Sequence, residues 1–126
     1  MILNTLLFFA AFLLVFVGIG HSYLGERYVL MRLFRHVELP RLAGSSLYMK
    51  RVLRFAWHVT SLAWWGLAAI VVMLTQPPLN AHAVGSAVGA TSLATAVAVL
   101  VGSRGKHLAW LLFLVVGAIT IYAAVI

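Results

Sequence analysis

Residues 2–20, ILNTLLFFAAFLLVFVGIG, form a run of nineteen positions without a single charged side chain. An α-helix rises 1.5 Å per residue, so about twenty such residues cross a hydrocarbon core roughly 30 Å thick. A cleaved signal peptide would carry a basic segment before a shorter apolar core. This run has neither feature, so we expect a retained transmembrane helix.

Three more apolar runs of the same length follow, at residues 55–74, 83–102 and 107–126. Of the 126 residues, 64% are hydrophobic and 9% are charged, which is too apolar for a soluble domain of this length. The second run is closed by Gln76-Pro77-Pro78, where a helix must stop. The sequence therefore predicts one all-α domain over 1–126, an integral membrane four-helix bundle with spans at about 2–20, 55–74, 83–102 and 107–126.

The basic residues decide the predicted orientation. All nine lie in two connections: seven between the first and second spans, and two between the third and fourth. They are Arg27, Arg32, Arg35, Arg41, Lys50, Arg51, Arg54, Arg104 and Lys106. By the positive-inside rule both connections are cytoplasmic, and the N and C termini are periplasmic. Anionic lipid headgroups then account for the net charge of +7, and no nucleic acid is required as a partner.

The segment at about 23–39 has the pattern of a surface helix. Val29, Leu30, Leu33, Phe34 and Val37 fall on one half of a helical projection, and Arg27, Arg32, Arg35 and His36 on the other. Such a helix lies in the membrane interface, although a helix that binds a protein partner would have the same pattern. Pro40 ends it, and the Gly44-Ser45-Ser46 turn predicts an N-cap for the next helix.

The third span carries small residues on one face, Gly85, Gly89, Ser92 and Ala96. In lipid, small residues allow close packing of helix backbones. Gly85 and Gly89 therefore face either another helix of the same chain or a second copy, and association with a larger membrane complex is a further alternative.

Three histidines from three spans are predicted to share the cytoplasmic membrane level. His21 ends the first span, His58 opens the second and His107 opens the fourth, with Glu26 nearby. Imidazoles with a carboxylate suit a transition metal, two imidazoles suit haem b, and a His–Glu pair suits acid–base catalysis. Arg54 and Ser61 share a helix face with His58 and would orient these ligands. Alternatively, the histidines belong to an interfacial belt with Tyr23, Trp57 and Trp110, with Glu26 paired to an arginine.

The residue types that the sequence lacks reduce the number of possible functions. The chain has no cysteine, and no Asp, Glu, Lys or Arg lies in the middle of a span, so an ion-coupled transporter is not expected. The segments HSYLGER and RFAWHVTSLAWWG together resemble uncharacterised bacterial inner-membrane proteins, a resemblance that implies a location and no activity. Two hypotheses remain: an integral or accessory subunit of the bacterial inner membrane that works by helix packing, or a metal- or haem-binding membrane protein, with an oxidoreductase as one form of it. The sequence does not decide whether the protein is an enzyme.

Overall fold

The computed structural model describes residues 1–36 and 38–126, and the described part is almost entirely helical. Its elements are α1 (Ile2–Leu24), the π-helical turn η1 (Gly25–Leu30), α2 (Met31–His36), α3 (Ser46–Met73), α4 (Ala81–Ser103) and α5 (Ala109–Val125). By length and composition, three helical segments could span a membrane: 2–36, α3 and α4. The fourth apolar helix, α5, has 17 residues, the lower end of the length that crosses a bilayer. The all-helical prediction is confirmed.

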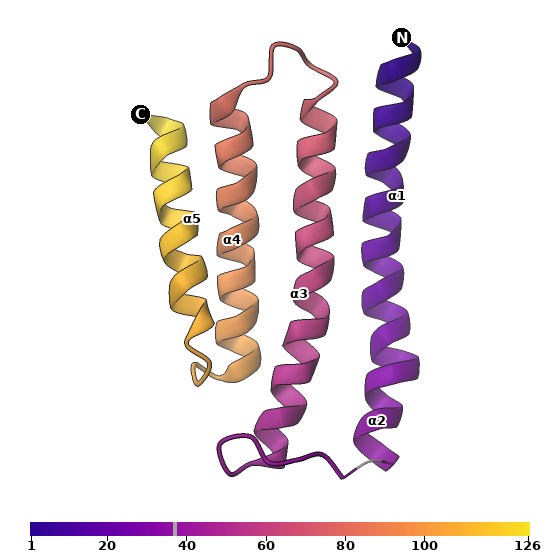
Figure 1. Ribbon diagram of the computed structural model, residues 1–126, viewed down its shortest axis with the longest axis vertical. Coiled ribbons are helices and arrows are strands. Elements are labelled where there is room, and N and C mark those ends of the chain that lie inside the picture. The colour runs from indigo at the N-terminus through magenta and orange to yellow at the C-terminus, as the bar shows by residue number, and fades with distance from the viewer. Residues whose placement is uncertain (37) are drawn as a thin grey trace.

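The first helix runs further than the sequence indicated. Residues 2–36 form one continuous helix of 35 residues, so 23–36 extend the first span along its own direction (Figure 1). The helix widens to a π-helix at Gly25, where the N–H of Met31 donates to the carbonyl of Glu26, five residues back. The predicted helix at 23–39 is therefore helical to His36, but it is not a separate element. Val37, assigned to its apolar face, lies outside the described residues.

Helix α3 begins where the sequence predicts a cap. The Ser45 hydroxyl accepts a hydrogen bond from the backbone N–H of Tyr48 at 3.1 Å, which satisfies one of the free donors of the first turn. The helix starts nine residues before the apolar run, so Arg51 and Arg54 are on its first turns. In the α3–α4 connection, the side chain of Asn80 caps the start of α4. The other end of α4 is at Arg104, whose backbone is in the left-handed conformation.

The helices stand in an open row, in the order α1, α3, α4, α5 (Figure 1). Among the described residues, extensive contact is made between consecutive helices, α1 with α3, α3 with α4 and α4 with α5. The four predicted helices are therefore present, and in the described part of the chain they form a single layer. Helices in lipid are not driven to close around an apolar core, because the surrounding acyl chains are equally apolar.

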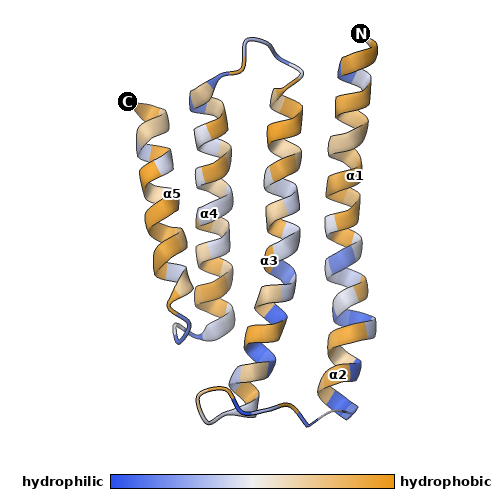
Figure 2. Cartoon of the chain, viewed as in Figure 1, coloured by the Kyte–Doolittle hydropathy of each residue, from blue (hydrophilic) through white to orange (hydrophobic). Residues whose placement is uncertain are grey.

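Polar residues gather at one end of the row. Both basic connections, 38–45 and 104–108, lie there, and the two termini lie at the opposite end (Figure 1). The hydropathy colouring shows the same division, with most hydrophilic residues at the end of the basic connections and hydrophobic residues along the rest (Figure 2). The predicted grouping of the basic residues at one end of the molecule is confirmed.

Within each pair of neighbouring helices, glycines allow a close approach of the two backbones. A Cβ on Gly102 would lie 2.7 Å from the Cβ of Phe55, and one on Gly89 would lie 2.6 Å from the Cγ1 of Ile121. In α1, Gly18 lies directly against the indole ring of Trp65, and at the start of η1, Gly25 lies against that of Trp57. Each glycine thus forms a notch that holds a larger side chain of the neighbouring helix, as expected for close packing in lipid.

The small-residue face of α4 is covered by the same chain. Gly85 lies against Ala124 and the carbonyl of Thr120, and Gly89 lies against Thr120 and Ile121, all on α5. Of the alternatives for Gly85 and Gly89, the structure shows packing within the chain, because both glycines contact α5.

Two glycines of α1, two residues apart, give a matched test of the notches. Gly18→Ala places a methyl group against the Trp65 ring, whereas Gly20 has no atom within 4 Å of an added Cβ. Both substitutions raise helix propensity equally, so their difference isolates the packing. We expect Gly18→Ala to lower the free energy of unfolding by about 1–3 kcal/mol relative to Gly20→Ala, the usual cost of overpacking. Circular dichroism during denaturation in detergent micelles measures the free energy of unfolding of both variants. Equal values would contradict close packing of Gly18 against Trp65.

Candidate functional site

A chain of polar side chains joins α1 to α3 near the basic end of the row. The Ser61 and Ser22 hydroxyls lie 2.8 Å apart, and the Ser22 oxygen lies 2.9 Å from His58 Nδ1. His58 Nε2 lies 3.4 Å from Glu26 Oε2. Ser61 is 1% exposed, whereas the His58 and Glu26 side chains are about one-third exposed. The network therefore runs from the interior of the helix pair to its surface.

An ion pair completes the network at its exposed end. Arg54 Nη2 lies 2.8 Å from Glu26 Oε1, and Arg54 Nε donates to Glu26 Oε2 at 3.1 Å. This two-bond geometry fits a guanidinium to a carboxylate. The Arg54 side chain is 50% exposed, so the pair contributes about 1 kcal/mol or less to stability. The prediction that Glu26 pairs with an arginine is confirmed.

Helical spacing explains why these residues meet. Arg54, His58 and Ser61 lie at i, i+4 and i+7 on α3, the shared face that the sequence predicts. Ser22 of α1 and Glu26 of η1 are four residues apart on one continuous helix, so they also share a face. Ser22 is the network residue absent from the predicted site. Helical spacing could have identified Ser22. A residue that shares a helix face with Glu26 lies four positions away, as Ser22 does, and not five, as His21 does.

His21 lies on a different side of α1, among tryptophans. Its ring stacks on the Trp57 ring at a centroid distance of 4.6 Å and meets the Trp64 edge at 5.0 Å. Its Nε2 is buried and has no hydrogen-bond partner among the described residues. Trp57 Nε1 donates to the His21 carbonyl at 3.0 Å. His21 therefore belongs to an aromatic cluster and lines an apolar groove of about 510 Å³ between α1 and α3.

His107 is held at the other side of α3. Its ring meets the edge of Phe55 at 5.4 Å, and its Nδ1 accepts a hydrogen bond from the backbone N–H of Ala109 at 3.3 Å. His107 thus stabilises the entry to α5. It shares no contact with His21 or His58.

The positions of the three histidines and Glu26 can be compared with the predicted metal centre. The structure brings His58 and Glu26 together, with Arg54 and Ser61 beside them, but it turns His21 and His107 toward other neighbours. In the described part of the chain, no three His, Asp or Glu side chains gather where they could hold one ion. A single ion bound by His21, His58, His107 and Glu26 together stays a prediction, and the observed arrangement favours the His58–Glu26 pair. Rotation of α1, set by its glycine notches, directs Ser22 and not His21 toward His58.

The order Ser22–His58–Glu26 contains the residue types of a nucleophilic triad, but the backbone does not suit that chemistry. A hydrolytic serine needs hydrogen-bond donors aimed at the developing oxyanion. Ser22 lies within α1, whose N–H groups are engaged in the helix ladder. Among the described residues, the hydrogen bonds of this network end at the buried Ser61 hydroxyl. The network is suited to joining two helices.

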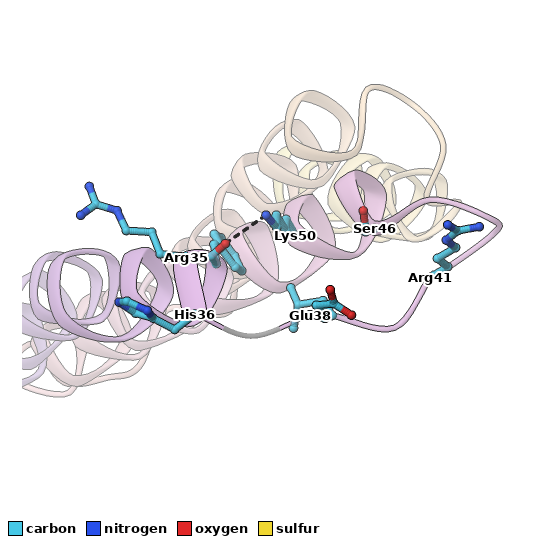
Figure 3. Close-up of a pocket in the computed structure, with 8 residues that line it drawn as sticks. Arg35, His36, Glu38, Arg41, Ser46 and Lys50 are labelled. Atoms are coloured by element: carbon cyan, nitrogen blue, oxygen red, sulfur yellow. Dashed lines mark hydrogen bonds between the residues drawn. The ribbon is translucent and has the colours of Figure 1, made fainter.

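A second polar region lies at the basic end, beside the 38–41 connection. The cavity of about 480 Å³ is lined by Phe34, Arg35, His36, Glu38, Leu39, Arg41, Ser46 and Lys50. Lys50 Nζ donates to the Phe34 carbonyl at 3.1 Å, which joins α3 to α2 (Figure 3). Arg35 and Arg41 point away from the other side chains drawn (Figure 3). The cations of this cavity therefore do not converge on one ligand position.

Comparisons with protein-family models, with curated proteins and with solved structures found no match for this chain.

The Ser22–Ser61 contact makes a specific prediction about stability. Ser22→Ala leaves the buried Ser61 hydroxyl without its partner, which is expected to cost about 1–2 kcal/mol, since an unsatisfied buried group loses its hydration. The double variant Ser22→Ala/Ser61→Ala removes both groups, so it is expected to be about 1 kcal/mol more stable than additivity of the single variants predicts. Unfolding of the four proteins in micelles measures the coupling, and strict additivity would show that the two hydroxyls do not interact.

Proposed function

We propose that this chain is a multi-pass protein of the bacterial inner membrane that acts as an integral or accessory subunit through helix packing. The observation that carries the proposal is the set of hydrogen-bond partners of the polar side chains. Several of them bind a neighbouring helix or its end: Asn4 donates to the Thr75 carbonyl at 3.4 Å, His82 Nδ1 to the Ala124 carbonyl at 2.9 Å, and Ser22 bonds Ser61. The threonine hydroxyls bond carbonyls three or four residues back in their own segment. In a membrane subunit, bonds between helices hold them together where water cannot satisfy the polar groups.

The exposed surface supports the same function. Only 11% of the most apolar stretch of the first helix is buried, against 22% for α3 and α4. Phe8, Phe12 and Phe16 form an exposed stripe along α1, at one edge of the row. A surface this apolar requires lipid or another apolar layer of helices, because its exposure to water would be strongly unfavourable. In this proposal the uncovered faces contact the bilayer or the other subunits of a larger complex.

The proposed orientation places the basic end in the cytoplasm and both termini in the periplasm. The nine basic residues support it through the positive-inside rule. The first turns after residue 23 then lie at the level of the cytoplasmic headgroups, where Arg27 meets anionic lipid, and the helix continues to Arg32 and Arg35 on the cytoplasmic side. Arg32 already lies over the Tyr28 ring at 6.0 Å, a pairing typical of an interfacial segment.

Because the chain has no cysteine, single cysteines can report this orientation. Leu79→Cys lies in the α3–α4 connection, and Lys106→Cys in the α4–α5 connection; both residues are exposed. We expect a membrane-impermeant maleimide to label Leu79→Cys in spheroplasts, and to label Lys106→Cys only after lysis. Arg41→Cys should behave as Lys106→Cys does. The reverse pattern would overturn the orientation, and labelling of all three before lysis would overturn the membrane location.

The alternative function, a metal or haem protein, now depends on His58 and Glu26. This pair supports it because two ligand types lie 3.4 Å apart, although Ser22 and Arg54 also bind them. The two functions differ in composition: a packing subunit is expected to be purified colourless and without stoichiometric metal. Elemental analysis and an absorption spectrum of the detergent-purified protein test this. Stoichiometric metal or a haem band, lost in His58→Ala and retained in His82→Ala, would establish the alternative.

A further inference from the structure

A groove between α3 and α4 opens at the basic end of the row, on the side of α3 away from the tryptophan cluster. Its volume is about 530 Å³. Val97, Ala98, Val101 and Gly102 of α4 form one wall, and Phe55 with the first turns of α3 forms the other. Val97 and Val101 are 59% and 69% exposed. The wall of this groove is therefore an apolar strip that the chain itself leaves uncovered.

Three arginines surround the polar end of the groove: Arg51 and Arg54 from α3, and Arg104 from the end of α4. Arg54 is bound by Glu26 on the α1 side. Arg51 and Arg104 have no ion pair or side-chain hydrogen bond with the other described residues. The second acidic residue, Glu38, lines the separate cavity beside Lys50. The groove therefore has two cations whose charge nothing in the described chain neutralises.

The order of these features along α4 matches one ligand shape. From Val97 to Arg104 the helix rises about 10 Å, at 1.5 Å per residue. The apolar wall comes first and the cation last, in the direction from the centre of the proposed membrane to its cytoplasmic surface. A ligand that fits has an anionic head and an apolar tail directed along the helix. A small water-soluble anion would leave the apolar wall exposed.

We infer that this groove is a binding site for one anionic phospholipid of the cytoplasmic leaflet. Arg51 and Arg104 hold its phosphate, and an acyl chain lies along Val97 and Val101. Guanidinium groups suit this role because they bind phosphate oxygens in a fixed planar geometry. The inference rests on the proposed membrane location and orientation, and it adds a specific lipid position to the general attraction of basic loops for anionic headgroups.

The test uses two photoactivatable lipids with the same diazirine-bearing acyl chain, one a phosphatidylglycerol and the other a phosphatidylcholine. Each is included at a low fraction in phosphatidylcholine nanodiscs that contain the full chain. Mass spectrometry then measures labelling of residues 97–102. A basic group beside an anionic headgroup contributes roughly five-fold in affinity. We therefore expect the phosphatidylglycerol probe to label this segment up to roughly twenty-five-fold more than the phosphatidylcholine probe.

Variants separate the site from general electrostatic attraction. Arg104→Asn removes one cation and tolerates the left-handed conformation at φ 53°, so it should reduce the preference roughly five-fold. Lys106→Ala removes the same charge from the same connection but does not line the groove, so it should change little. Val101→Trp keeps every charge and fills the groove, so it should reduce labelling by both probes. Circular dichroism confirms that each variant remains helical.

Each contrary result has a definite meaning. Equal labelling by the two probes would overturn the site and leave only surrounding lipid, with the membrane location intact. An equal effect of Lys106→Ala and Arg104→Asn would show diffuse attraction and also overturn it. Suppression of labelling by millimolar glycerol phosphate would assign the groove to a soluble phosphate ester. An absence of labelling by either probe anywhere on the chain would contradict the proposed membrane location itself.

Discussion

Two tryptophans of α3 fix the position of α1, and the rest of the α1–α3 contact depends on them. Trp65 lies on Gly18 and donates to the Val15 carbonyl at 3.3 Å; Trp57 lies on Gly25 and donates to the His21 carbonyl at 3.0 Å. In both cases a ring occupies a glycine notch, and its N–H binds a carbonyl in the preceding turn. Such contacts combine close packing with a satisfied donor, which is what holds helices together in the absence of water. They fix both the height and the rotation of α1.

The polar network follows from that rotation. Once the notches face α3, the turn that contains Ser22 and Glu26 also faces α3, so these side chains meet Ser61, His58 and Arg54. At the far end of the same pair, Asn4 binds the Thr75 carbonyl. Helix α1 has extensive contact with α3 alone among the long helices, so these bonds hold it in the row. The His58–Glu26 region is therefore first a joint between two helices.

Much of this fold could be predicted from local signals. Hydropathy located four helices, Ser45 marked the start of α3, and the spacing of Arg54, His58 and Ser61 gave their common face. The partners of each histidine could not be obtained in that way, because they depend on how each helix is rotated about its axis. Rotation is set by contacts between segments far apart in sequence, such as Gly18 with Trp65. A shared membrane level placed three histidines at similar heights, but it did not bring their rings together.

The open row also gives α3 two different sides. Its contact with α1 is partly polar and uses Ser61, His58 and Glu26. Its contact with α4 is close and has no side-chain hydrogen bond among the described residues; it places Gly66 against Thr91 and Phe55 against Gly102. Arg54 lies where the two sides meet, and Glu26 holds it toward α1, so the charge free to act in the α3–α4 groove comes from Arg51 and Arg104. In a closed bundle the α4 wall of that groove would face other helices. A single layer leaves it open, which is why an architecture with so little interior can still offer a defined binding position.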